Sequence, residues 1–345
     1  MKHYEEKPQE FVLTSIQKKR SLQEVFLSTF HSQLTFDDFL NLNVAHEYKK
    51  VEIQKRVIYI PSYKLKRIHK FLNNTVFNHA RFNTDVVFSY RKGISVRDAV
   101  TPHAKNKFFF QTDIVSFYQS IKTNDVERAL KNQLSDVPIS DIDRYIDHIV
   151  NLVVVDDHIP AGFATSPVLS NICLVNFDDA LLEYCKTQHL TYTRYSDDII
   201  ISGEYELEHK VIEIFVTELL KANLGRAAEL NIQKTKRYKR GHDFKLLGLN
   251  ILPNGVVTIP RESKNEIEVM LYLYLTDAKG FDDYVKHTFF SSETDIDSST
   301  LRERGIAKLS GKIISAKSMD NNYISKLRRK YGNTIMEMFI RKSVK

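Results

Sequence analysis

Three aspartates stand next to strongly apolar segments, a pattern that limits which folds and functions the chain can have. Asp113 closely follows the apolar run 108–110, and Asp197 and Asp198 stand at a tight turn directly before the apolar run 199–201. Carboxylates at the ends of buried strands are costly unless they are neutralised, and hard divalent cations can do this. If the two acidic segments meet in space, they predict a two-metal site for phosphoryl transfer. Each aspartate taken alone is also consistent with a turn or capping residue.

Hydrophobic periodicity along the chain switches between helical and strand patterns. Strand patterns cover residues 51–60, 85–90, the first half of 107–121, two strands within 190–203, and a hairpin over 244–259 that turns at Pro253-Asn254-Gly255. Helical patterns cover residues 14–50, 63–80, 124–155, 167–186, 206–223 and, apart from a polar loop near 291–299, the chain from about 262 onward. We therefore predict an α+β fold with a small, mostly antiparallel sheet in the middle and a helical C-terminal unit.

The charge balance favours an anionic partner. The 345 residues include 50 Lys and Arg against 43 Asp and Glu, which gives a net charge of +7. The polar N-terminus does not resemble a signal peptide, and no apolar run reaches the roughly 18–20 residues of a membrane span. The 2 cysteines exclude a disulfide framework and suit a reducing compartment. We expect a cytoplasmic protein with no membrane partner.

Three segments, in this order, resemble the palm motifs of reverse transcriptases. DIVSFY begins at Asp113, GFATSP covers 162–167, and RYSDDIIISG covers 194–203 and contains a YxDD box. The resemblance implies a right-hand polymerase with fingers, palm and a helical thumb. The implied domains are an N-terminal helical extension at 1–50, fingers and palm at 51–260, and a nucleic-acid-binding thumb at 261–345. Within the palm, motif A lies at 113–118, motif B at 160–171 and motif C at 195–198.

The resemblance also implies which residues carry the chemistry. Asp113, Asp197 and Asp198 are the expected catalytic carboxylates, and together with Ile114 they are expected to hold two Mg²⁺ ions, which Mn²⁺ could replace. Lys234 in LNIQKTKRY resembles the motif D lysine, which is thought to protonate the leaving pyrophosphate. Without the resemblance, a solvated turn charge is an equal alternative for this lysine.

Residues on the N-terminal side of the palm are expected to bind the incoming nucleotide. The segment KRVIYIP resembles the fingers motif whose arginine contacts the triphosphate, which assigns this role to Arg56, with Lys50 and Lys66 as further candidates. Tyr118 matches the aromatic residue that excludes a ribose 2′-hydroxyl, so the expected substrates are deoxynucleoside triphosphates (dNTPs). A surface cation and a core aromatic are the alternatives for Arg56 and Tyr118.

Two basic runs are candidates for contact with a nucleic-acid backbone. Residues 234–245 hold 6 Lys and Arg with 1 acid, and residues 326–345 hold 7 with 1 acid. The expected contacts are Lys236, Arg237, Lys239, Arg240, Arg328, Arg329 and Lys330. The alternative is a solvated helix face, which charge runs usually are.

Within the family, the catalytic box and the segment 310–332 resemble bacterial retron-type enzymes. Two departures point to the wider group of defence-associated enzymes, which includes the abortive-infection polymerases. Motif B begins Pro160-Ala161-Gly162 instead of Pro-Gln-Gly, so Ala161 and Gly162 are expected beside the nucleotide without the usual glutamine. Leu246-Leu247-Gly248 stands where retron enzymes have Val-Thr-Gly.

The function implied by this resemblance is an RNA-directed DNA polymerase that copies a noncoding RNA template in bacterial antiphage defence. Its expected partners are that RNA, an RNA–DNA hybrid, dNTPs, and an effector protein or a second copy of the chain. One alternative is a template-independent, protein-primed polymerase of the abortive-infection type, although the residues after 260 leave little room for its large helical domain. A non-catalytic RNA-binding scaffold is a second alternative, which the intact aspartates disfavour.

Overall fold

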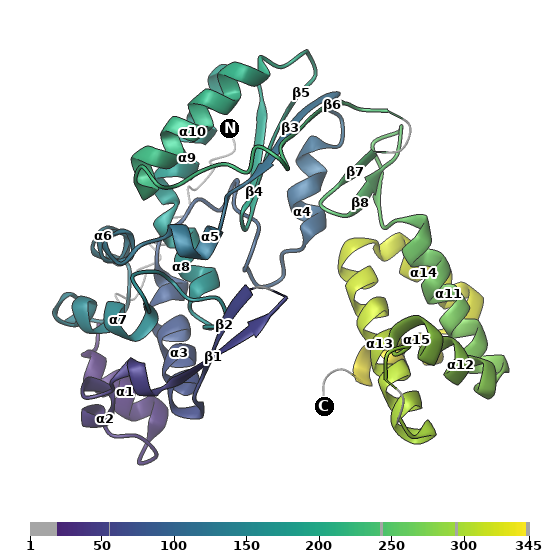
Figure 1. Ribbon diagram of the computed structural model, residues 1–345, viewed down its shortest axis with the longest axis horizontal. Helices are drawn as coiled ribbons and strands as arrows, with labels where there is room; N and C mark the ends of the chain where they lie inside the picture. Colours follow the sequence, from purple (N-terminus) through teal and green to yellow (C-terminus); the bar gives the residue numbers. More distant parts are fainter. Residues whose placement is uncertain (1–18, 55, 242–243, 294–295, 343–345) are drawn as a thin grey trace, which may run out of the picture. The chain divides into compact units, whose positions relative to one another are not determined.

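The computed structural model describes residues 19–54, 56–241, 244–293 and 296–342 (Figure 1). The chain folds into two compact units, and each unit is made from two stretches of sequence. Unit 1 combines the chain up to Phe82 with Tyr118–Val175, and unit 2 combines Asn83–Phe117 with Asn176–Lys345. Residues 1–18 of the predicted N-terminal extension lie outside the described residues.

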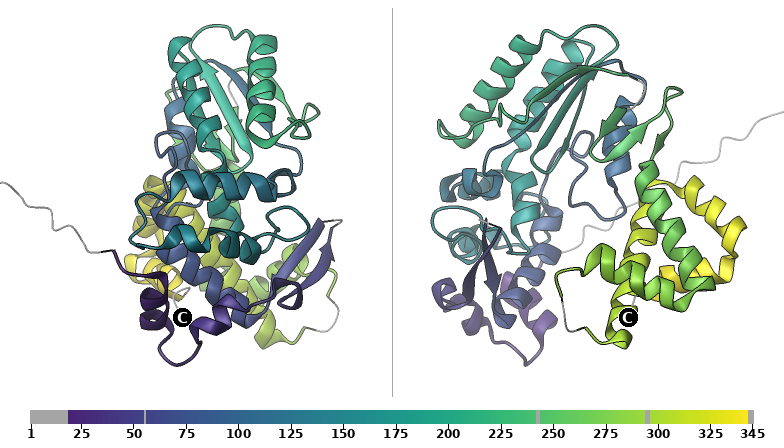
Figure 2. Two further views of the ribbon diagram at one scale, coloured as in Figure 1. Left: turned by 90° about the vertical axis from the view of Figure 1, so that its left-hand side faces the viewer. Right: turned by 45° about the vertical axis from the view of Figure 1, so that its right-hand side comes forward.

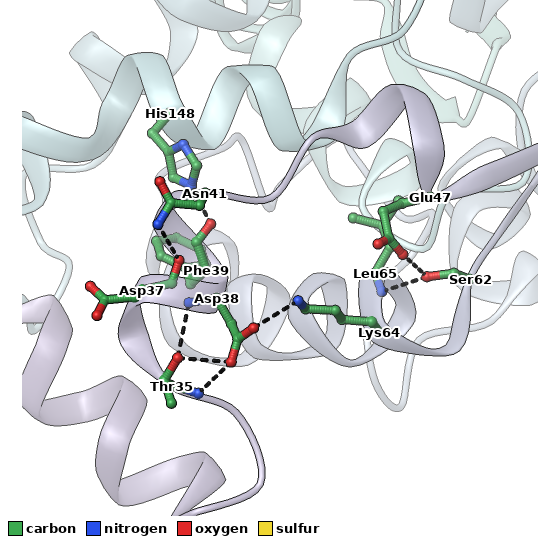
Figure 3. A network of polar contacts seen from close by, with 10 residues as sticks. All are labelled: Thr35, Asp37, Asp38, Phe39, Asn41, Glu47, Ser62, Lys64, Leu65 and His148. Atoms are coloured by element: carbon green, nitrogen blue, oxygen red, sulfur yellow. Dashed lines mark hydrogen bonds and ion pairs between the residues drawn. The ribbon is translucent and has the colours of Figure 1, made fainter.

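Unit 1 begins with short helices around an aromatic core. The helices are α1 (Leu22–Phe30), α2 (Phe36–Leu40) and α3 (Tyr63–Thr75). Ser21 and Thr35 cap α1 and α2 with reciprocal hydrogen bonds, which satisfy the first backbone N–H groups of each helix. The ring of Phe26 packs against those of Phe39 and Phe71. Polar contacts also join these helices. Lys64 on α3 pairs with Asp38 on α2 at 3.0 Å (Figure 3).

The predicted strand at 51–60 is a hairpin of two strands, so this prediction was wrong. Strand β1 (Tyr48–Ile53) pairs antiparallel with β2 (Arg56–Pro61). Gln54 has a left-handed backbone with φ of 51°, and it lies between the two strands. The sequence offers no Gly, Asn or Asp at this reversal, and these residues are the usual signal of a tight hairpin.

Three predicted helical segments are each divided. Within 14–50, the described residues form α1, α2 and, from Tyr48, the start of strand β1. Residues 124–155 form α6 (Thr123–Gln133) and α7 (Ile146–Val153), and Pro138 in the connection prevents a continuous helix. Residues 167–186 form α8 (Ser166–Cys173) and α9 (Val175–Thr187), because the backbone leaves the helical range at Leu174. The predicted strand at 85–90 is reduced to a single bridge from Val87 to Arg194.

The centre of unit 2 is a four-stranded antiparallel sheet in the order β4-β5-β3-β6. Its strands are β3 (Phe108–Asp113), β4 (Thr191–Tyr195), β5 (Asp198–Gly203) and β6 (Lys236–Lys239). Helices α9 and α10 (His209–Leu224) lie on one side of the sheet, and α4 (Val96–Val100) lies on the other (Figure 1). The apolar centres of β3 and β5 are buried, and the acidic residues lie at one end of these two strands.

A second, smaller sheet lies in sequence between the four-stranded sheet and the C-terminal helices. It contains β7 (Phe244–Leu246), β8 (Leu249–Ile251) and β9 (Val257–Thr258). The predicted turn at Pro253-Asn254-Gly255 is confirmed, since Gly255 N donates to Leu252 O at 2.8 Å. The predicted single hairpin was incomplete, because Leu247 and Gly248, both with positive φ, add a turn between β7 and β8.

The chain then forms the predicted helical C-terminal part. Its helices are α11 (Arg261–Thr276), α12 (Ala278–Phe289), α13 (Ser298–Met319), α14 (Asn321–Tyr331) and α15 (Asn333–Lys342), which Figure 2 shows from two further directions. One apolar core continues from Phe109 and Ile200 of the four-stranded sheet to Phe281 and Phe339 of these helices. Among the described residues, no helix combines the length and apolar character needed to cross a membrane.

Acid should destabilise unit 2 through His103. Its buried imidazole lies between Thr193 Oγ1, 2.8 Å from Nε2, and Ser202 Oγ, 2.6 Å from Nδ1. Burial lowers the pKa of His103 from 6.5 to about 3. Because the folded-state pKa is the lower one, the neutral ring stabilises the fold fully above the unfolded value, and this stability is lost as pH falls through and below 6.5.

We expect the Tm of the wild-type protein to fall between about pH 7 and about pH 5, and to fall less in a His103→Gln variant. Thermal unfolding at constant ionic strength measures both slopes. The same pH slope in the two proteins would contradict the role of this histidine.

Candidate active site

The three predicted catalytic carboxylates meet at one end of the four-stranded sheet. Asp113 is the last residue of β3 and Asp198 is the first residue of β5, and they are direct partners in the strand register. Asp197 lies in the turn before β5, where Ser196 has a left-handed φ of 61°. Ile114 N donates to Asp197 O at 3.3 Å, which connects the end of β3 to this turn. Partner residues in a register point to the same face, so Asp113 and Asp198 share one face of the sheet.

A loop before β6 closes on Asp113. Asn231 N donates to Asp113 O at 2.8 Å, and Asn231 Nδ2 donates to Asp113 Oδ2 at 3.3 Å. Lys234 Nζ lies 3.4 Å from the same carboxylate oxygen, while its side chain remains 66% exposed. Lys234 therefore lies beside one of the three carboxylates, and its role as a proton donor stays a prediction. Sequence reasoning missed Asn231, and its only signal was its position shortly before Lys234.

Asp198 is half-buried next to the other two carboxylates. Burial, together with the repulsion from Asp197 and Asp113, raises the pKa of Asp198 to about 6. Gln111 Nε2 approaches Asp198 Oδ1 at 3.5 Å, and Tyr238 OH donates to Gln111 Oε1 at 3.3 Å. Lys234 beside Asp113 offsets part of this negative charge, and a divalent cation would relieve the remaining repulsion among the three carboxylates.

The oxygen donors fit a divalent cation whose coordination is completed by the substrate. Among the residues that the structure describes, no group of three or more His, Cys, Asp or Glu side chains is arranged to hold a metal by itself. Magnesium sites commonly use one or two carboxylates together with substrate phosphates and water. Asp113, Asp197 and Asp198 provide such carboxylates, and Lys234 supplies a positive charge beside one of them.

In unit 1, the predicted triphosphate-binding residues lie on the β1–β2 hairpin and on α3. Arg56 begins β2 with an exposed side chain, and Lys66 is exposed on α3. Lys50 on β1 is engaged, because its Nζ pairs with Asp156 Oδ2 at 2.6 Å. The Tyr59 hydroxyl donates to the same oxygen at 2.9 Å. Asp156 is a further residue that sequence reasoning did not predict as a partner.

The motif B loop packs directly on strand β2. Ala161 O accepts a hydrogen bond from Tyr59 N at 2.7 Å. Gly162 has φ of 109°, and a Cβ added there would lie 2.3 Å from Tyr59 O. Only glycine combines this backbone conformation with so close an approach. Tyr118, the predicted ribose-selecting residue, is half-buried on the short helix α5 (Phe117–Ser120).

Many of the predicted nucleic-acid contacts already have partners within the protein. Ion pairs join Arg237 to Glu213, Arg328 to Glu337 and Lys330 to Glu268. Arg240 instead donates to the backbone carbonyls of Ala104, Leu252 and Pro253. Lys236, Lys239 and Arg329 have no ion-pair partner within the described part of the chain. These three cations are thus the most available for a phosphate backbone.

Comparison with known proteins gives a consistent set of similarities. Residues 48–251 match the family described as reverse transcriptase (RNA-dependent DNA polymerase). The chain is 29% identical over 301 residues to the retron Ec73 reverse transcriptase of Escherichia coli, covering 83% of this chain and 88% of the relative. It is 23% identical over 325 residues to the retron Ec86 reverse transcriptase of the same species, covering 93% and 92%. Among solved structures, apo telomerase from Candida tropicalis aligns with a TM-score of 0.46 at 10% identity, covering 85% of this chain and 67% of that one.

Proposed function

Because the chain belongs to the reverse transcriptase family and is an RNA-directed DNA polymerase, we propose that Asp113, Asp197 and Asp198 form its catalytic centre. The observation that carries this proposal is the register of β3 and β5, which pairs Asp113 with Asp198 and places Asp197 in the adjoining turn. Three carboxylates from two distant segments would repel one another at this edge without a cation. The proposed reaction is two-metal nucleotidyl transfer, in which a primer hydroxyl attacks the α-phosphate of a dNTP and pyrophosphate leaves.

Different residues of the site would bind the metal ions and donate a proton in this reaction. Asp113, Asp197 and Asp198 would hold two divalent ions, with Ile114 beside them on the backbone. When bound, such ions supply Lewis-acid stabilisation of the attacking and leaving oxygens. Lys234 would donate a proton to the leaving pyrophosphate, and its contact with Asp113 supports its place in the site.

Residues of the fingers would orient the incoming nucleotide. We propose Arg56 as the main triphosphate contact, because its exposed guanidinium has no ion-pair partner among the described residues, whereas Lys50 is held by Asp156. Lys66 would add positive charge from α3. Tyr118 would exclude a ribose 2′-hydroxyl, so that deoxynucleotides are selected.

The backbone around Ala161 would stand beside the nucleotide where other family members have a glutamine. Motif B contributes backbone and a close contact with β2 at this point, and no amide side chain. Base pairing with the template would then provide most of the selection among bases.

The helical region 261–345 is proposed as the thumb that holds an RNA–DNA hybrid. A groove of about 750 Å³ lies within unit 2 between the turn at Gly248 and helices α11 and α13. Its lining is largely apolar and includes Lys308, together with Arg304 and Lys312, which pair with Glu293 and Glu266. Cations next to apolar surface suit a duplex backbone that lies across helices.

We place the enzyme with the retron-type polymerases that copy a dedicated noncoding RNA, in the cytoplasm of a bacterium and in antiphage defence. The support is the similarity to retron reverse transcriptases over most of both chains. An effector protein or a second copy of the chain would be a further partner in that setting.

Sequencing the nucleic acid that copurifies with the protein tests the template. We expect one discrete RNA and, after dNTPs are added, cDNA complementary to part of it. Treatment with protease and with RNase, before and after synthesis, shows what the DNA is attached to. Low-complexity DNA linked to the protein, without complementary RNA, would contradict the proposal and support a protein-primed polymerase.

A further inference from the structure

Arg194, which directly precedes the YxDD box, carries a fully buried charge in unit 2. Its side chain and that of Asp178 on α9 are both 0% exposed. Arg194 Nε donates to Asp178 Oδ1 at 2.8 Å, and Nη2 donates to Oδ2 at 2.6 Å. The Tyr192 hydroxyl adds a third hydrogen bond to Oδ1 at 2.7 Å. The carboxylate therefore holds the guanidinium plane in one orientation.

The remaining arm of this guanidinium reaches the catalytic turn. Arg194 Nη1 donates to Ser196 O at 3.0 Å, and Ser196 is the left-handed residue directly before Asp197. A non-glycine residue in this conformation is strained and persists only where its surroundings impose it. Tyr90 OH, 2.6 Å from Ser196 Oγ, holds the same residue from the side chain.

The backbone of Arg194 is fixed as firmly as its side chain. Its N–H donates to Val86 O at 2.8 Å, and its carbonyl accepts from Phe88 N at 3.1 Å. With the backbone held, the position of the guanidinium depends on its contacts with Asp178 and Ser196. Arg194 thus couples helix α9 to the turn that presents two of the catalytic carboxylates.

Stability alone is a poor explanation for this arrangement. Removing two charges from water is costly, and apolar residues of similar volume often replace a buried ion pair without loss of stability. An apolar pair, however, has no donor for Ser196 O. Lysine would not substitute either, because one ammonium lacks the planar fork that binds a carboxylate in two places and still points a third N–H elsewhere.

We propose that Arg194 and Asp178 are positioning residues, which hold Ser196 in its left-handed conformation so that Asp197 and Asp198 stand ready for the metal ions. This pair is called the turn clamp below. This inference rests on the proposed function, because the turn clamp has a catalytic role only if Asp197 and Asp198 bind the metal ions.

The test is a double variant, Arg194→Met with Asp178→Leu, which removes both charges and keeps the volume. We expect its Tm to fall less than that of Arg194→Met alone, because the single variant leaves a buried unpaired carboxylate, whereas the double variant leaves only the Tyr192 hydroxyl without its acceptor. The rate of a single nucleotide addition at saturating substrates should fall about 10- to 100-fold, and the Mg²⁺ concentration for half-maximal rate should rise.

Hydrogen exchange gives a readout that does not depend on activity. The peptide that contains residues 195–199 should exchange faster in the double variant than in the wild-type protein, without metal or nucleic acid. Arg194→Lys, which keeps a charge opposite Asp178, should show the same faster exchange, so the test remains decisive if the double variant does not fold.

The helical region offers a matched control. Arg302 pairs with both carboxylate oxygens of Asp282, at 3.0 and 2.9 Å, and its Nη2 also donates to Ala278 O at 2.5 Å. Arg302→Met with Asp282→Leu removes an ion pair of similar two-point geometry from α12 and α13, although its side chains are 40% and 21% exposed and those of the turn clamp are buried. It should leave the exchange of 195–199 and the Mg²⁺ dependence unchanged.

The two hypotheses fail in different ways. If the double variant keeps the wild-type rate, Mg²⁺ dependence and turn exchange, the clamp is wrong while the catalytic assignment stands. If Asp197→Asn still synthesises DNA, the proposed function itself is wrong, whatever the clamp variants do.

Discussion

An Asp197→Asn variant should bind RNA as tightly as the wild-type protein and yet incorporate dNTPs about 10⁴-fold more slowly, a barrier increase on the order of 5 kcal/mol. The amide is nearly the same size as the carboxylate, so the β4–β5 turn should keep its shape. It carries no negative charge, so it is a far weaker ligand for a hard divalent cation. Single-turnover primer extension with saturating dNTP and Mg²⁺ measures the loss, and filter binding measures RNA affinity.

Asp85→Asn is a suitable control for this experiment. Asp85 is exposed in unit 2, and no contact of its carboxylate with the catalytic aspartates is seen. Its variant should extend primers at the wild-type rate. DNA synthesis retained by Asp197→Asn would exclude the proposed centre, and synthesis lost in both variants would point to damaged folding.

The sequence could predict the centre of this site because its signals are local. Asp113 follows an apolar strand pattern, and Asp197 and Asp198 stand at a tight turn before another, so antiparallel pairing of the two strands brings their acidic ends together. The α+β class and the turn at 253–255 follow from the same kind of local pattern.

What the sequence could not predict depends on contacts between distant segments. Asn231 reaches Asp113, and Asp178 reaches Arg194, only because the folded chain brings different elements together. Asp156 holds Lys50 in the same way, so a lysine that looks free in the sequence is already paired. The hairpin at Gln54 was missed for a different reason, because its reversal lacks the residues that usually mark a turn.

Gly162→Ala should lower the free energy of unfolding of the protein substantially, because it adds one methyl group at a tightly packed point in unit 1. The new Cβ would lie 2.3 Å from Tyr59 O and 3.2 Å from Tyr59 C, and backbone cannot rotate away as a side chain can. The positive φ of 109° adds strain for any residue with a Cβ. Strain and overpacking together should cost about 2–4 kcal/mol of unfolding free energy.

The expected functional consequence is a rise in the KM for dNTP of about tenfold or more, because displacing β2 moves Arg56 away from the position in which it would meet the triphosphate. Gly225→Ala separates the effect of backbone strain from the effect of the clash with Tyr59. Gly225 follows α10 with φ of 86°, and nothing lies within 4 Å of its added Cβ, so this variant carries the strain without the clash. It should lower the Tm by less and leave the KM for dNTP unchanged. Equal losses of Tm in both variants, with an unchanged KM in Gly162→Ala, would show that the close contact between motif B and β2 does not position the nucleotide-binding strand.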